Sequence, residues 1–252
     1  MHPLTMPACL PTNALRTGLA LLTLGLSTVA SLAAPPQDIR FAPGSSAAEV
    51  KGRLKGDTDT DYRLVAGAGQ TLSVELLASN ASQNFNVFAP GSDEAMFSSA
   101  SGGFKANLVL PTDGAYRIQT FLMRNAARRG EATQYTLKVA VSGAALPALP
   151  GTQDAKVPGT GFHATAQLPC KPPYAAATQC EAGVIRRGRD GTATVVIRGP
   201  NQLLRQILFV KGQPVTSNTT QAMKARREGD TTVVDIGGEE RYDIPDVLLT
   251  GG

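Results

Sequence analysis

Short stretches in which polar and apolar residues alternate constrain this chain more than any other feature of its sequence. Ala115–Leu122 and Gln134–Val141 both alternate in this way, which is the pattern of a β-strand with one buried face. Similar stretches recur along the chain, and turns rich in glycine or proline, such as 67–69, 89–91 and 111–114, separate them. Short strands at regular spacing with turns of this kind indicate an antiparallel β-sandwich.

The segment between these two strands is basic. Residues 124–133 read RNAARRGEAT, with three arginines and no apolar side chain larger than alanine. We therefore expect the two strands to form a hairpin that holds an exposed basic loop. If 124–129 forms one helical turn, Arg124 and Arg128 lie on the same face, because residues four apart are neighbours on a helix. From the residues alone, a solvated hairpin tip is the plain alternative to a functional loop.

The N-terminus has the composition of an export signal. Arg16 precedes an apolar run over 19–26, which leads to Ser31-Leu-Ala33, a small-x-small pattern typical of a cleavage site. We expect cleavage after Ala33, so that residues 1–33 form a signal peptide and the mature protein is periplasmic or secreted. The apolar run is short for a membrane span, so we expect none after signal removal; a retained anchor is the alternative.

Removal of the signal leaves two cysteines, Cys170 and Cys180. Because exported chains meet oxidising conditions, we expect a disulfide that closes a short loop around 171–174. Two cysteines and the single mature histidine, His163, do not make a metal-ligand set. The aspartates of 57–62 alternate as in a calcium loop, but the glycine and the distal glutamate of such a loop are missing. We expect no metal, no cofactor and a solvated turn at 57–62.

Composition divides the mature chain into two parts. Residues 143–161 are rich in proline, glycine and alanine, as in a linker. We expect 34–142 to form the β-sandwich and 162–252 a small β-rich domain, whose modest core the disulfide supports. The expected fold is all-β: an N-terminal antiparallel β-sandwich joined by a proline/glycine linker to a small C-terminal domain with one disulfide. No activity attaches to the pattern of that second domain.

Composition also argues against several classes of function. The whole chain carries a formal charge of +4, a weak excess for a nucleic-acid surface, so we expect no nucleic-acid partner. His163 alone could activate a nucleophile, and we expect it at the surface or at a strand edge. Motifs for serine hydrolases, zinc proteases and phosphate loops are absent from the sequence. Paired carboxylates of the glycosidase kind stay open, but nothing singles out a pair, and we expect no enzyme.

A series of motifs between Lys55 and Val141 occurs in an order known from one family. The series is KG, DTDTDY, AGAGQTLSVEL, FNVFAPG, LPTDGAYRIQ, RNAARR and QYTLKVAV. In this order it resembles the periplasmic inhibitors of goose-type lysozyme. The arginine-bearing RNAARR is the most specific motif, whereas GQTLSVEL and DGAYRI recur in the wider set of pre-peptidase-like β-sandwich modules.

The resemblance implies a β-sandwich that binds an enzyme rather than one that catalyses a reaction. The resembling inhibitors use a tyrosine near the second strand and two loop arginines, which match Tyr62, Arg124 and Arg128. Arg129 stands where the family has another basic residue, and we expect it to support the pair. Guanidinium groups bind carboxylates through planar forks, and the goose-type cleft holds a catalytic glutamic acid. This chain departs from the family in its second domain and at Ala126, where a more polar residue is expected.

Two functions are therefore compatible with the sequence. The first is an exported inhibitor whose arginine-bearing loop occludes the cleft of a goose-type lysozyme. The second is a non-catalytic envelope or glycan-binding module, for which the absence of tryptophan is unfavourable, because sugars stack on aromatic faces. Tyr62 packing inside the sandwich is the alternative to a partner contact, and the oligomeric state stays open.

Overall fold

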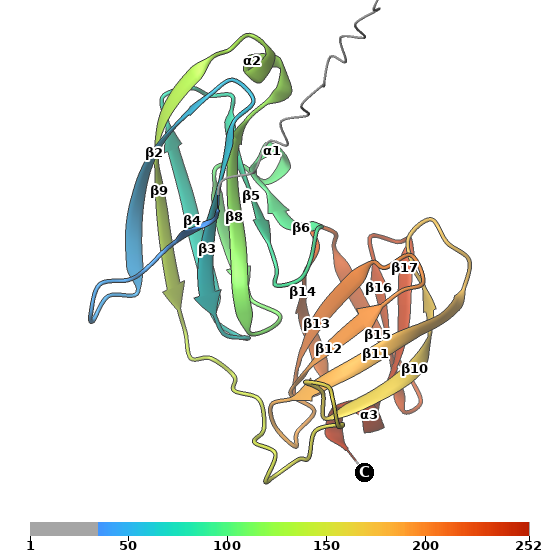
Figure 1. Cartoon of the computed structure of the whole chain (residues 1–252). Coiled ribbons are helices and arrows are strands. Elements are labelled where there is room, and N and C mark those ends of the chain that lie inside the picture. The colour runs from blue at the N-terminus through green and yellow to red at the C-terminus, as the bar shows by residue number, and fades with distance from the viewer. Residues whose placement is uncertain (1–34, 252) are drawn as a thin grey trace, which may run out of the picture. The chain divides into compact units, whose positions relative to one another are not determined.

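The computed structural model describes residues 35–251, so the expected signal peptide and its cleavage site lie outside the described residues. The described chain is all-β, as predicted, with strands β1 to β17 and three short helices (Figure 1). No helix among residues 35–251 combines the length and apolar character needed to cross a membrane. The described residues belong to one compact unit, 34–252.

Residues 37–142 form two sheets, the N-terminal sandwich. The strand order is β1-β3-β8-β5-β6 in one sheet and β2-β9-β4-β7 in the other. Neighbouring strands are antiparallel, except that β1 pairs with β3 in parallel. The elements are β1 (Gln37–Asp38), β2 (Ala47–Lys55), β3 (Asp59–Ala66), β4 (Thr71–Ala78), β5 (Gln83–Phe88), β6 (Ala95–Ser98), α1 (Ser99–Gly102), β7 (Lys105–Val109), β8 (Gly114–Leu122), α2 (Arg124–Arg128) and β9 (Ala132–Ser142).

The alternating stretches place their apolar residues in one core between the two sheets. On β8 the side chains of Tyr116 and Ile118 are buried, and on β9 those of Leu137 and Val139 are buried against them. Because successive side chains of a strand point to opposite faces, a slip of one residue would expose this whole set. Each fully buried large apolar side chain stabilises the fold by about 1.5–3 kcal/mol, so burial fixes the register of both sheets.

Residues 164–245 form one eight-stranded sheet, the C-terminal sheet. Its order is β14-β13-β12-β11-β10-β17-β16-β15, and the end strands β14 and β15 approach each other, so that the sheet is nearly a barrel around a second core. The elements are β10 (Ala164–Lys171), β11 (Thr178–Arg186), β12 (Ala193–Arg198), β13 (Leu204–Val210), β14 (Gln213–Ser217), β15 (Met223–Glu228), β16 (Thr231–Ile236), β17 (Glu240–Pro245) and α3 (Asp246–Thr250).

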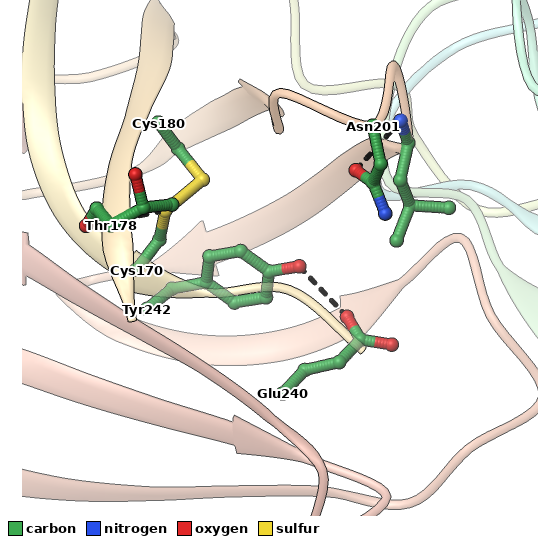
Figure 2. The surroundings of a disulfide bond; sticks show 7 residues. Cys170, Thr178, Cys180, Asn201, Glu240 and Tyr242 are labelled. Atoms are coloured by element: carbon green, nitrogen blue, oxygen red, sulfur yellow. Dashed lines mark hydrogen bonds between the residues drawn. A yellow bond between two sulfur atoms is a disulfide. The ribbon is translucent and has the colours of Figure 1, made fainter. Parts of the chain in front are cut away.

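The disulfide expected between Cys170 and Cys180 is present, with an S–S distance of 2.06 Å (Figure 2). Both cysteines are buried in the second core. They lie on the neighbouring strands β10 and β11, where Leu168 faces Cys180 and Cys170 faces Thr178. The bond therefore closes the β10–β11 turn, residues 172–177, near its base and ties the two strands together.

Polar contacts join the C-terminal sheet to the sandwich. Arg205 lies on β13 with its side chain 2% exposed, and it pairs with Glu94 at 2.7 Å and with Glu240 at 2.6 Å. The buried Arg187 side chain pairs with Asp113 at 2.7 Å. Further bonds run from Thr194 to the Pro111 carbonyl, Gln206 to the Pro90 carbonyl, Thr216 to the Val109 carbonyl, Asn218 to Ser92 and Thr219 to Glu94. The C-terminal sheet is thus docked on the sandwich through charged and polar groups.

Candidate functional site

The arginine-bearing loop connects the two sheets of the sandwich. Strand β8 pairs with β3 and β5, whereas β9 pairs with β2 and β4. The expected β8–β9 hairpin is therefore wrong: the two strands lie in opposite sheets, and the loop crosses from one to the other at the end of the sandwich (Figure 1). Each end of the loop is consequently held by a different sheet.

Arg124–Arg128 forms a helical turn, α2, as the spacing of the arginines suggested. The Ala127 amide donates to the Met123 carbonyl at 3.0 Å, and the Arg129 amide donates to that of Ala126 at 3.1 Å. The turn ends at Gly130, whose φ of +68° lies in the left-handed region that glycine adopts at helix ends. Arg124 and Arg128 therefore share a face of this turn, and both are exposed.

Ala126 anchors the inner face of the turn. Its side chain is fully buried, and its carbonyl accepts bonds from the amides of Arg129 and Glu131. The Gly56 amide, from the β2–β3 turn, donates to the Glu131 carbonyl at 2.8 Å. A more polar residue was expected at position 126, but a small apolar side chain suits this buried position.

The three arginines of the loop differ in their partners. Within residues 35–251, Arg124 and Arg128 make neither an ion pair nor a side-chain hydrogen bond. Arg129 instead pairs with Glu131, with its Nη2 at 2.6 Å from Oε1, and Glu131 also accepts a bond from Asn80 at 2.8 Å. These bonds, first from Asn80 and then from Arg129, hold the pKa of Glu131 below its usual value. Arg129 thus fastens the loop to the sandwich.

Tyr62 lies in the core rather than beside the arginines. Its side chain is 2% exposed, and its hydroxyl is 2.7 Å from that of Tyr135, which accepts a bond from Thr120 Oγ1 at 3.2 Å. Burial, together with the neighbouring Tyr135, raises the pKa of Tyr62. Tyr62 comes from one sheet and Tyr135 from the other, so the hydroxyl contact links the two sheets. The expected contact between Tyr62 and a partner conflicts with this burial.

A hollow of about 780 Å³ lies beside the arginines. Asp57 and Thr58 line it from the β2–β3 turn, and Met123, which is partly exposed, lines it from the loop. The aspartate-rich segment 57–62 is only in part a turn, because β3 begins at Asp59. The chain pattern gave no signal for Asp57, Thr58 or Met123 as neighbours of Arg124, since their proximity depends on the chain crossing between sheets.

His163 has a structural role. It is buried, so the expectation of a surface or strand-edge position is wrong in its exposure. Its Nδ1 accepts a bond from the Arg186 amide at 2.9 Å, and its Nε2 lies 2.9 Å from the Leu149 carbonyl. Nε2 therefore carries the proton and donates it to this carbonyl. Both ring nitrogens are engaged, which leaves neither free to accept a proton from a nucleophile. The described residues contain no group of three candidate ligands suited to a metal ion.

Comparison with known proteins identifies the family. An inhibitor of g-type lysozyme from Escherichia coli (strain K12) is 31% identical over 127 residues, which cover 48% of this chain and 93% of the relative. The chain belongs to the family of g-type (goose-type) lysozyme inhibitors. The relationship concerns about half of the chain, in keeping with the resemblance of the N-terminal sandwich alone. No family model matches the chain.

Solved structures of two inhibitors of this family are also similar. The Aeromonas hydrophila protein PliG, a periplasmic inhibitor of g-type lysozyme, is 38% identical and covers 42% of this chain and 96% of its own, with a TM-score of 0.40. The Salmonella Typhimurium PliG is 25% identical and covers 43% of this chain and 99% of its own, with a TM-score of 0.36.

Proposed function

We propose that this protein inhibits goose-type lysozyme by inserting Arg124 and Arg128 into the active-site cleft of the enzyme. One observation carries the proposal: these two guanidinium groups are exposed and unpaired within residues 35–251, on one face of a turn that both sheets anchor. Membership of the inhibitor family supplies the class of partner.

The physical advantage of this arrangement is preorganisation. Arg124 and Arg128 have no internal ion pair to break before they meet carboxylates of the enzyme. The anchored turn also reduces the conformational entropy that binding would cost. Each planar guanidinium can donate two parallel hydrogen bonds to one carboxylate. Such charge pairs contribute most where both partners lose water, although their net contribution to affinity differs between complexes.

The other expected contact residues have supporting roles in this proposal. Arg129 holds the loop through Glu131, and Tyr62 fixes the spacing of the sheets beneath it through Tyr135. Occlusion of the cleft requires no bond to form or break, so we infer a non-enzymatic mode of action for the sandwich.

We further propose the boundaries of the exported protein. Residues 1–33 act as a cleaved signal peptide, 34–142 form the inhibitory sandwich, 143–161 the connection and 162–252 the second domain. Export to the periplasm accords with the description of the related inhibitors as periplasmic. On α2, Arg124 and Arg128 remain exposed in the presence of the second sheet.

The test is the clearance of a turbid cell-wall suspension by a goose-type lysozyme, with and without the protein lacking residues 1–33. Chicken-type lysozyme is the specificity control. We expect selective inhibition of the goose-type enzyme that weakens as salt is added, because exposed charges are screened. Clearance that proceeds at an unchanged rate with micromolar protein would exclude the proposal.

A further inference from the structure

A second hollow lies beside the disulfide-closed turn of the C-terminal sheet. Its volume is about 430 Å³. Its walls come from parts of the chain far apart in sequence, including the turn 172–177, the loop before β13 and the connection between β16 and β17. It is separate from the arginine loop, since the two hollows share no lining residue.

An exposed tyrosine stands at this hollow. Tyr174 is 96% exposed, whereas Tyr62, Tyr116, Tyr135 and Tyr242 are all buried. The turn that carries it is closed by the Cys170–Cys180 disulfide. Tyr174 follows two prolines, which have fixed φ angles, and it adopts a φ of +57°. The short, disulfide-closed turn thus holds the Tyr174 ring exposed to solvent.

The rim of the hollow carries hydrogen-bonding groups without protein partners. Asn201 Oδ1 accepts a bond from the Leu203 amide at 3.3 Å (Figure 2), whereas its amide group donates none within the described chain. The side chains of Gln221 and Glu239 likewise make no hydrogen bond or ion pair among residues 35–251. Together these residues offer amide donors, amide acceptors and one carboxylate around a single space.

The floor of the hollow is charged but internally satisfied. Arg205 donates to both oxygens of Glu240 and to Glu94. The Tyr242 hydroxyl also donates to Glu240 (Figure 2). With Glu239 on the rim, three carboxylates line the space against one guanidinium. This negative balance disfavours an anionic occupant. The floor groups need no ligand to complete their bonding, so the recognition must come from the rim.

We propose that this hollow binds an uncharged sugar of a glycan chain. An aromatic ring next to a small set of converging polar groups is the usual make-up of a site for a small polar ligand with apolar faces. The C–H face of a sugar ring would stack on Tyr174, and its hydroxyl or acetamido groups would bond to Asn201, Gln221 and Glu239. The proposal goes beyond lysozyme inhibition, because it gives the second domain a ligand of its own.

The test measures, by titration calorimetry, whether the protein lacking residues 1–33 binds a β-1,4-linked hexamer of N-acetylglucosamine. A β-1,4-glucan hexamer distinguishes recognition of acetamido groups from recognition of hydroxyls alone. We expect saturable binding that Tyr174→Phe retains and that Tyr174→Ala weakens on the order of tenfold, or about 1.4 kcal/mol. Alanine keeps a Cβ at the left-handed position, so the backbone is no freer than with tyrosine.

The Arg124→Ala/Arg128→Ala variant separates this proposal from lysozyme inhibition. We expect it to bind the N-acetylglucosamine hexamer as the unaltered protein does, whatever its effect on the enzyme. Thermal unfolding of Tyr174→Ala at an unchanged midpoint would show that the fold is intact. The proposal would be overturned if the protein bound neither hexamer at millimolar concentration. It would also be overturned if Tyr174→Ala bound the N-acetylglucosamine hexamer with the affinity of the unaltered protein.

Discussion

Two pairs of arginines occupy opposite environments in this molecule. Arg124 and Arg128 lie exposed on α2 and have no ionic partner within residues 35–251. Arg187 and Arg205 are buried and paired with carboxylates of the sandwich. The same guanidinium group therefore has two uses: where it is already paired it holds the protein together, and where it is unpaired it is available to another molecule.

The difference follows from the cost of removing charge from water. A buried guanidinium is costly unless a carboxylate pairs with it, and Arg205 has two such partners, Glu94 and Glu240. An exposed arginine pays no such cost, so it contributes little to stability. Substitutions should consequently separate the two pairs, with large effects on stability for one and on inhibition for the other.

The largest expected effect on stability is that of Arg205→Ala. This change leaves the carboxylates of Glu240 and Glu94 without their guanidinium, and breaking a buried pair on one side costs about 3–5 kcal/mol. Urea unfolding measures the loss. The control is Lys224→Ala, which removes an exposed cation of the same sheet and should change stability by less than about 0.5 kcal/mol. Equal stability of the two variants would contradict the structural role of Arg205.

The next effect is that of removing the disulfide by Cys170→Ala/Cys180→Ala. The bond restricts the unfolded chain, and its loss typically costs about 2–4 kcal/mol. Thermal unfolding with and without reductant measures it, and the double variant should be insensitive to reductant. Because the cysteines lie in the second core, lysozyme inhibition should survive at temperatures where the protein stays folded. Loss of inhibition with retained folding would show that the two regions depend on each other.

A smaller effect is expected for Ala126→Val beneath the loop. The position is fully buried, and added methyl groups in a packed site cost about 1–3 kcal/mol. The displaced turn should also inhibit less well. Ala132→Val adds the same atoms at an exposed position at the start of β9 and serves as the control for urea unfolding and inhibition. Full inhibition by Ala126→Val would mean that the turn need not be held in place.

The smallest effect concerns the pH dependence of the Glu131 contacts. Bonds from Asn80 and Arg129 lower the pKa of Glu131 in the folded protein from its usual 4.5. The ionised Glu131 carboxylate therefore contributes its full stabilisation of the folded protein above the pKa of the unfolded state. This stabilisation is lost as the pH falls through the lower pKa of the folded state. The melting temperature should exceed that of Glu131→Gln at pH 7, and the gap should close towards pH 3. A constant gap would show that the carboxylate charge is immaterial.

The alternation of residues was enough to predict the all-β class and the core faces of strands such as β8 and β9, because burial on one face imposes a period of two. The disulfide was predictable because only two cysteines follow the signal segment. Pairing between strands was not: β8 and β9 follow each other in sequence but lie in opposite sheets, and alternation does not encode the partner of a strand. Strand β15 could not be predicted from alternation, because its residues are almost all exposed and carry no periodic signal.

The candidate site could be predicted only in part, because the sequence shows which residues are close along the chain but not which become neighbours in the fold. Clustering in sequence drew attention to Arg124 and Arg128, whose exposure agrees with a contact role. Tyr62 and Arg129 belong to motifs that carry the family resemblance. Their roles nevertheless depend on contacts with Tyr135 and Glu131 that the sequence does not reveal. Arg205 lies within an apolar strand, and its two carboxylate partners come from distant segments. No local pattern predicts such pairs.

The most direct measurement compares inhibition of goose-type lysozyme by the unaltered protein and by Arg124→Ala/Arg128→Ala. Lys156→Ala/Lys224→Ala removes the same charge from exposed positions outside the loop and is the matched control. We expect the loop variant to keep its unfolding free energy within about 0.5 kcal/mol and to lose inhibition by tenfold or more, on the order of 1.4 kcal/mol, while the control inhibits normally. Inhibition by the loop variant at the strength of the control would show that Arg124 and Arg128 do not carry inhibition.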